Sequence, residues 1–324
     1  MKSSERIILN VSDKDLLRRM GQAEERYMLN PEACADSLIQ RIHKPTAEMI
    51  GAPLPWGKVR GLFGFRPGEI TIWSGYNGHG KSQIMGQVMS WVAPFNNVAI
   101  ASFEMLPELT LTRMMRQIAG SRVPSEEYIR KVLRYLTGKL YIYDQRGPNS
   151  PERMLAATGY FAEKYEVKHM VIDSLMKCGM APDDYVKQKD FVDRLTEVAE
   201  LYGIHIHLVA HMRKPENGSE GSRPSRFSVS GHSDITNLAH NVLVTWRNKP
   251  KEKRVNNGEA DPELEGEPDQ LLMVDKQRNG EWEGQINLWY HRDSFQYTPD
   301  PRNLPMPYVD EVHHVTLSDE EIPF

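Results

Sequence analysis

A strand, a glycine-rich turn and a helix are predicted in succession in the first third of the chain. The apolar, β-branched run Glu69–Ser74 is followed by Gly75-Tyr76-Asn77-Gly78-His79-Gly80-Lys81-Ser82, and residues 83–91 suit a helix. This spacing and context are those of a phosphate loop, in which backbone N–H groups and the positive end of a helix dipole face one anion. The chain is therefore expected to carry this loop at the edge of a sheet in an α/β fold.

The residues of the loop have distinct predicted roles. Gly75, Gly78 and Gly80 permit the backbone angles that turn successive N–H groups toward a phosphate. We expect Lys81 to reach the β- and γ-phosphates and the Ser82 hydroxyl to bind Mg²⁺. An ordinary glycine-rich surface turn is the alternative, and the strand–loop–helix context argues against it. The sequence thus predicts a site for ATP, or another nucleoside triphosphate, with Mg²⁺.

The composition excludes several classes of protein. With 324 residues the chain can bury a large core, and no apolar run approaches the ~18 residues that suggest a membrane span. Cys34 and Cys178 make neither a disulfide framework nor a zinc pattern, and residues 1–6 lack the apolar core of a signal peptide. A reducing, cytoplasmic setting follows. The formal net charge of −4 argues against a general nucleic-acid coat, although a groove can be locally basic on an acidic body.

Short apolar strands alternate with helix-compatible segments through the middle of the chain. The predicted strands after the loop are residues 98–103, 140–143, 169–173 and 204–210. Such alternation indicates a mainly parallel sheet covered by helices on both faces. Residues 241–246, 271–275 and 285–290 follow without intervening helices and are expected to add strands near the end of the sheet.

The domain prediction has three parts. Residues 1–54 are expected to form an N-terminal helical arm and linker, because charged and apolar positions alternate at helical spacing from Ser12 to His43. Residues 46–68, rich in glycine and proline, look like a connector into the first strand. Residues 55–298 form the core, and residues 299–324 a flexible acidic tail. Whether the arm docks on its own subunit or on a neighbour stays open.

Side chains at the carboxyl ends of the predicted parallel strands are candidates for chemistry, because ligands bind there in open α/β sheets. Asp173 can hold Mg²⁺ through water, or alternatively cap the next turn. Glu104 can act as general base toward the attacking water, or alternatively favour a helix start. His211 can hydrogen-bond the γ-phosphate. His205 and His207 share a strand face, but no cysteine or acidic partner stands at ligand spacing, so core packing is favoured over metal binding.

A basic loop is predicted beyond His211. Residues 213–234 are rich in glycine and serine, and their cations are Arg213, Lys214, Arg223 and Arg226. A loop of this kind at the nucleotide edge of the sheet suits contacts to the backbone of single-stranded DNA. A surface loop without a binding role is the alternative.

Several of these motifs together resemble a known family. The phosphate loop is followed, in order, by Ser102–Met105, Val171–Ser174, Val209–Lys214 and Lys276–Gly280. This order resembles that of hexameric replicative helicases with a RecA-type core, a family that includes DnaB, the mitochondrial Twinkle helicase and phage primase-helicases. The resemblance covers about residues 55–298 and implies a RecA-like P-loop NTPase core. His211 stands where DnaB usually has Gln, so the chain looks closer to the Twinkle and phage branch, and no primase module precedes the core.

The resemblance implies further site residues. Lys276 and Arg278 are expected to act in trans on the nucleotide of a neighbouring subunit, where an arginine finger contributes about 10³ to 10⁵ in rate. A solvated hairpin tip is the alternative. Arg247, with Phe295 or Tyr297, is expected to hold the adenine, although either aromatic can equally be core.

The functional prediction is an ATP-driven DNA helicase that forms a homo-oligomeric, hexameric ring and translocates on single-stranded DNA in a bacterial or phage-infected cytoplasm. A RecA-like recombinase or regulatory ATPase without unwinding, or a nucleotide-gated helicase loader, are the alternatives. The chain ends in Asp319-Glu320-Glu321-Ile322-Pro323-Phe324, which resembles the acidic tip of bacterial single-stranded-DNA-binding proteins. This tip is expected to recruit a polymerase or primase; a solubilising tail is the alternative.

Overall fold

The computed structural model describes residues 28–43, 47–145, 149–212, 223–229, 233–259 and 261–309. Two compact units divide the chain, Met1–Met49 and Ile50–Phe324. In the first unit, the short 3-10 helix η2 (Pro31–Cys34) leads into helix α2 (Ala35–His43), and the side chain of Asn30 accepts a hydrogen bond from the Glu32 N–H. The helix predicted from Ser12 is therefore interrupted within its described part, because Pro31 starts a new helical segment.

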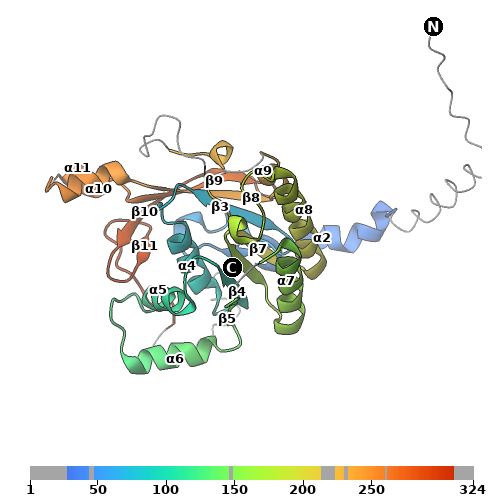
Figure 1. The fold of residues 1–324 in the computed structure, drawn as a ribbon, viewed down its shortest axis with the longest axis horizontal. Helices are drawn as coiled ribbons and strands as arrows, with labels where there is room; N and C mark the ends of the chain where they lie inside the picture. Colours follow the sequence, from blue (N-terminus) through green and yellow to red (C-terminus); the bar gives the residue numbers. More distant parts are fainter. Residues whose placement is uncertain are drawn as a thin grey trace, which may run out of the picture. The chain divides into compact units, whose positions relative to one another are not determined.

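The second unit is built on a nine-stranded sheet with the order β11-β10-β9-β8-β3-β7-β6-β4-β5 (Figure 1). Strands β8, β3, β7, β6, β4 and β5 are parallel, and β9, β10 and β11 continue the sheet as antiparallel strands. The bounds are β3 Ile70–Gly75, β4 Val98–Ser102, β5 Leu140–Ile142, β6 His169–Asp173, β7 His205–Val209, β8 Asn241–Arg247, β9 Gln270–Gln277, β10 Gly284–His291 and β11 Gln296–Thr298. The mainly parallel α/β fold and the added strands near its end are confirmed.

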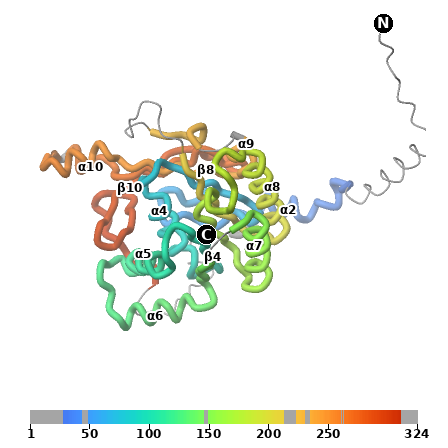
Figure 2. The backbone as a smooth tube through the Cα atoms, in the orientation of Figure 1, coloured from blue at the N-terminus to red at the C-terminus, as the bar shows by residue number. Residues whose placement is uncertain are grey.

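Helices cover both faces of this sheet, as the backbone trace also shows (Figure 2). Trp73 of β3 packs into one core cluster with side chains of α4 and α5, whereas Ile70 and Ile72 pack into the other with side chains of α7 and α8. This alternation follows from the two-residue period of a strand. The helices are α4 Lys81–Val92, α5 Pro107–Ala119, α6 Glu126–Leu136, α7 Pro151–Tyr165, α8 Tyr185–Tyr202, α9 Ser233–Leu238, α10 Lys249–Asn256 and α11 Pro262–Gly266.

From Ile50 onward, the glycine- and proline-rich segment before β3 is a packed part of the second unit. The connector expected at residues 46–68 holds helix α3 (Ala47–Ile50), the 3-10 helix η3 (Gly57–Val59) and a two-stranded antiparallel sheet of β1 (Ala52–Pro53) and β2 (Gly64–Phe65). Trp56, Phe63 and Phe65 are at most 2% exposed. Burial of these three aromatic side chains holds this part of the connector on the core.

The segment after β11 also packs on the core. The Tyr308 N–H donates to the Ile118 carbonyl at 2.8 Å, and the Tyr128 hydroxyl donates to the Val309 carbonyl at 2.7 Å. Val309 is buried. Within the segment expected to form a flexible tail, Tyr308 and Val309 are therefore held on the core. The acidic tip, Asp319-Glu320-Glu321-Ile322-Pro323-Phe324, lies outside the described residues.

Histidines form a neutral hydrogen-bonded group inside the sheet. The Trp73 indole N–H donates to Nδ1 of His207 at 3.2 Å, so the Nε2–H of His207 donates to Nδ1 of His169 at 3.1 Å. His205 bonds the Arg66 carbonyl through its Nδ1 at 2.7 Å. All three histidines are buried, and burial lowers their pKa. The core-packing role expected for His205 and His207 is confirmed.

Among the described helices, none is long and apolar enough to cross a membrane.

Candidate nucleotide-binding site

The phosphate loop joins the carboxyl end of β3 to the first turn of α4. Gly80 precedes α4 with φ of 80°, and a Cβ there would lie 2.9 Å from the Tyr297 hydroxyl. Gly75 has φ of 154°, and a Cβ there would lie 2.6 Å from the Thr245 carbonyl oxygen. Both positions therefore require glycine for backbone angle and for space. The strand, loop and helix predicted from the sequence are all present.

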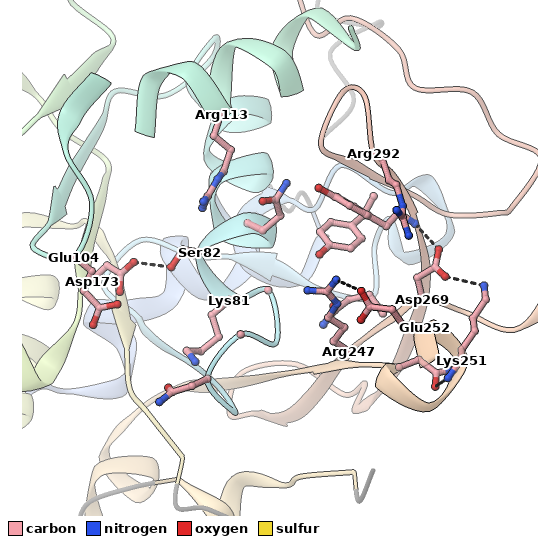
Figure 3. Close-up of a pocket in the computed structure, with 18 of the residues that line it drawn as sticks. Lys81, Ser82, Glu104, Arg113, Asp173, Arg247, Lys251, Glu252, Asp269 and Arg292 are labelled. Carbon is pink, nitrogen blue, oxygen red and sulfur yellow. Dashed lines mark hydrogen bonds and ion pairs between the residues drawn. The ribbon is translucent and has the colours of Figure 1, made fainter. Parts of the chain in front are cut away.

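The loop opens into a pocket of about 610 Å³ beyond the carboxyl ends of the parallel strands (Figure 3). This volume is in the range of sites for small molecules, about 300–1,000 Å³. One end of the pocket is lined by Lys81, Ser82, Glu104, Asp173 and His211. The strand-end residues that the sequence singled out are thus brought together with the loop.

Lys81 reaches across its own loop. Its Nζ donates to the carbonyls of Gly75 at 2.9 Å and Tyr76 at 3.1 Å. Burial lowers the pKa of Lys81, while the negative charges of Asp173 and Glu104 oppose that shift. The ammonium group therefore lies among carbonyls and carboxylates at the wall of the pocket, where an anion would exchange for those contacts.

Ser82 and Asp173 form the candidate Mg²⁺ site. The Ser82 hydroxyl donates to Oδ2 of Asp173 at 2.8 Å. Oδ1 of Asp173 is buried and has no hydrogen-bond partner among the described residues, and burial raises the pKa of this carboxyl group. Such an oxygen is expensive to bury unless a cation or a donor meets it. Mg²⁺ is held by one or two carboxylates together with phosphates and water, so these two residues fit it.

Glu104 is held by two neighbours at the same end of the pocket. Its Oε1 lies 3.3 Å from Nε2 of His211 and accepts the Ser174 hydroxyl at 3.2 Å. The hydrogen bond from His211 is the main reason that the pKa of Glu104 is lowered. Nδ1 of His211 lies 3.0 Å from Oδ1 of Asn77 in the phosphate loop. Glu104 is therefore an ionised carboxylate, as a general base must be, and His211 connects it to the loop.

The other end of the pocket carries the residues expected to hold the base. Arg247 and Tyr297 line it, and Arg247 pairs with Glu252 at 2.6 Å. Of the two aromatic alternatives, Tyr297 is in the pocket wall and Phe295 is not. The Phe295 ring instead stacks on Tyr290, with centroids 6.5 Å apart and planes 3° apart. Tyr290 itself lines the pocket, and no spacing pattern along the chain pointed to it.

Lys276 and Arg278 lie away from this pocket. They lie at the carboxyl end of antiparallel β9, which is next to the amino end of β8. The pocket lies beyond the carboxyl ends of the parallel strands, so these two cations are at the opposite ends of the strands. Nζ of Lys276 donates to the carbonyls of Thr236, Asn237 and Ala239 at 2.7–2.9 Å, and Arg278 donates to the Asn237 carbonyl at 2.7 Å. Burial and the charge of Arg278 lower the pKa of Lys276 to about 8. Both cations thus cap the carboxyl end of α9 in their own subunit.

The predicted DNA-binding residues are only partly described. Arg213 and Lys214 lie outside the described residues. The guanidinium of Arg223 is 5.7 Å from the centroid of the Trp246 ring. Arg226 bonds the Asp275 carbonyl at 2.6 Å and lies 3.9 Å from Glu283, so a DNA phosphate would compete with these acceptors.

Other residues of the pocket were not predicted. Asn77 was not singled out, although it lies within the phosphate-loop motif and could have been predicted from that position. Arg113 on α5, Lys251 on α10 and Asp269 before β9 reach the pocket only through tertiary packing, and Lys251 pairs with Asp269 at 2.7 Å.

Comparison with known proteins agrees with this geometry. A family model described as an AAA domain matches residues 59–217. A solved structure described as an ATPase domain superposes with a TM-score of 0.67 at 14% identity, covering 83% of this chain and 98% of that chain. A DnaB-like replicative helicase, described with its interactions with primase, superposes with a TM-score of 0.66 at 13% identity, covering 86% of this chain and 70% of that chain. The resemblance expected from the ordered motifs is confirmed at the level of the fold: the chain has an α/β P-loop core with the fold of these two solved structures.

Proposed function

We propose that this protein is an ATP-driven DNA helicase that assembles as a hexameric ring, translocates on single-stranded DNA and unwinds duplex. The observation that carries the proposal is the Ser82–Asp173 hydrogen bond of 2.8 Å beside the ionised Glu104, in a pocket that begins at a phosphate loop. A module that only binds nucleotide needs no general base at this position. The fold shared with a DnaB-like helicase supports a helicase function over other uses of ATP hydrolysis.

The residues at the phosphate end divide the work of hydrolysis. Lys81 and the loop N–H groups bind the phosphates, while Ser82 and Asp173 hold Mg²⁺, which when bound neutralises charge that develops on the phosphate oxygens. Glu104 orients the attacking water and accepts its proton. His211, which lies within hydrogen-bonding distance of both Glu104 and Asn77, is placed to respond when the γ-phosphate leaves.

The positions of the two proposed trans cations support the proposed ring assembly. In a head-to-tail interface the pocket edge of one subunit meets the opposite edge of the next, which is where Lys276 and Arg278 lie. To reach a neighbour's nucleotide, these cations must exchange their contacts to the carbonyls at the end of α9. Hydrolysis would then depend on assembly.

The DNA-binding proposal rests on basic residues beyond β7. Arg223 and Arg226 follow Arg213 and Lys214 in the sequence, and such cations bind the phosphates of a single strand without regard to base sequence. The proposal that the acidic tip binds a polymerase or primase rests on its sequence alone.

Stimulation of ATP hydrolysis by single-stranded DNA tests the proposed function. We expect Mg²⁺-dependent hydrolysis that rises several-fold when a single-stranded oligonucleotide is added and that is abolished by Lys81→Ala. Hydrolysis by Lys81→Ala at the parent rate would overturn the assignment of the site. A recombinase or regulatory ATPase would also show DNA stimulation, and strand separation distinguishes it from a helicase.

A further inference from the structure

Arg113 reaches the nucleotide pocket from helix α5. In Figure 3 its guanidinium points into the space above Ser82 and Lys81. Arg113 also lines a small adjoining cavity together with Ser82 and Asp173. Arg247 and Tyr297, the residues at the base end, are not part of that cavity. Arg113 therefore belongs to the metal and phosphate end of the site.

The guanidinium of Arg113 has no hydrogen bond or ion pair with any residue of the described part of the chain. Burial is the main reason that its pKa is lowered, and the neighbours whose charges oppose that shift, Tyr290, Tyr297 and Asp173, make no hydrogen bond or ion pair with it. Arg247 makes a useful contrast, because it lines the same pocket and is paired with Glu252 at 2.6 Å. The Arg113 side chain is partly buried, and a guanidinium whose donors lose water without gaining acceptors is unfavourable. Its position points to an anionic ligand.

The adjoining cavity explains why the side chain is held in this direction. The apolar part of its lining includes Met85, Met89, Met105 and Met114, which come from α4, α5 and the segment between β4 and α5. The side chain of Arg113 thus borders an apolar cavity on one side and the polar nucleotide pocket on the other, and its charged end favours the polar side.

We propose that Arg113 binds the terminal phosphate of the nucleoside triphosphate held in its own subunit. The inference rests on the proposed nucleotide-binding function and adds a residue to it. Lys81 approaches the phosphates from the loop, and Arg113 approaches from α5 on the other side of Ser82 (Figure 3). A guanidinium donates two parallel hydrogen bonds to a phosphate, so Arg113 distinguishes a triphosphate from a diphosphate within one subunit.

Equilibrium binding of fluorescent nucleotides to the full chain tests this inference. The probes are a non-hydrolysable ATP analogue and ADP, each with Mg²⁺. For Arg113→Gln we expect the affinity for the ATP analogue to fall by about 10-fold or more, as for loss of a charge-assisted bidentate contact, while the affinity for ADP changes less than about twofold. Arg113→Lys should recover part of the difference, because it keeps the charge but loses the two-point geometry.

A matched control comes from the same helix. Arg116 is one turn later on α5, its guanidinium lies 4.8 Å from the Phe295 ring centroid, and it lines neither cavity. Arg116→Gln should leave both affinities unchanged. The effect of Arg113→Gln should persist in an Arg278→Ala background, since Arg113 acts within its own subunit.

The outcomes separate this inference from the proposed function. Equal losses of affinity for ADP and the ATP analogue, or no loss for either, would overturn the role of Arg113 while the parent still binds both nucleotides. If the parent itself binds neither nucleotide, the proposed function and this inference fail together.

Discussion

The carboxylate of Glu69 accepts a 2.9 Å hydrogen bond from the side-chain amide of Asn279. Glu69 is only 3% exposed, and its second oxygen accepts the amide of Asn241 at 2.8 Å. It stands directly before β3, and Asn279 follows Arg278 in the turn after β9. Strand β3 thus starts beside the turn that carries Arg278, the proposed trans cation, and ends at the phosphate loop of the same subunit's pocket.

The Glu69–Asn279 contact predicts a positioning effect on catalysis. Glu69→Gln keeps the shape of the side chain but replaces one acceptor oxygen by an NH₂ group. That group would face the donating side-chain amide of either Asn241 or Asn279, so one of the two hydrogen bonds would be lost. We expect DNA-stimulated hydrolysis to fall by about 10-fold, a fraction of the full value of an arginine finger. Nucleotide affinity should stay within about twofold of the parent, because the loop of the same subunit is intact. Glu197→Gln, an exposed change on α8, serves as the control, and equal hydrolysis by the two variants would contradict the assignment.

Glu104→Gln predicts a separation of binding from turnover. The amide cannot accept the proton of the attacking water, so we expect the rate of hydrolysis to fall by about 10²- to 10⁴-fold. Binding of the ATP analogue should persist, because Lys81 and Ser82 are unchanged. Single-turnover hydrolysis measures the first quantity and titration the second. Glu108→Gln, an exposed change in the first turn of α5, should hydrolyse ATP as the parent does. Full activity of Glu104→Gln would show that Glu104 is not the general base.

Mixed subunits test whether Arg278 acts across an interface. Alone, Arg278→Ala and Lys81→Ala should each be inactive in DNA-stimulated hydrolysis. When the two proteins are mixed, an intact loop from one can meet an intact arginine from the other, so we expect part of the activity to return. Failure to recover activity at every mixing ratio would leave Arg278 with only its capping contact to α9.

The buried histidines predict a loss of stability in mild acid. Burial lowers the pKa of His169 to about 3 and those of His205 and His207 well below the usual value, so between the usual value and the lowered one the unfolded chain binds more protons. The stability from their neutral forms is complete above a pH of about 6.5 and declines below it, by up to about 1.4 kcal/mol per pH unit for each histidine.

Denaturant unfolding at pH 7.5 and 5.5 measures this loss directly. We expect a lower free energy of unfolding at pH 5.5, and a smaller difference between the two values in His169→Gln. His43→Gln, an exposed change on α2, should keep the parent's difference. Equal stability of the parent at both values would refute the assignment of neutral buried rings.

Comparison of the sequence with the structure shows which parts of the site are encoded locally. Gly80, Lys81 and Ser82 belong to one short motif, and Asp173 and Glu104 follow apolar strands whose carboxyl ends must meet in a parallel sheet. These residues were predictable. Arg113 was not, because its place in the pocket depends on how α5 packs against α4, and no spacing in the sequence reports that packing.

The two segments at the ends of the core show a second limit. Trp56, Phe63 and Phe65 lie among glycines and prolines, a composition that predicts turns but does not show whether the aromatic side chains between them are buried. Tyr308 and Val309 follow a proline-rich stretch and pack against α5 and α6. In both places local backbone signals indicated loops, and burial of a few large side chains decided the outcome.

Strand separation on a forked DNA duplex tests the central claim most directly. The full chain, ATP and Mg²⁺ are mixed with a labelled fork that has a single-stranded tail, and the same duplex without a tail and the Lys81→Ala protein serve as controls. We expect the parent to release the labelled strand from the tailed fork only, and Lys81→Ala to release none. ATP hydrolysis stimulated by the fork with no strand released would contradict the claim that this ATPase is a helicase.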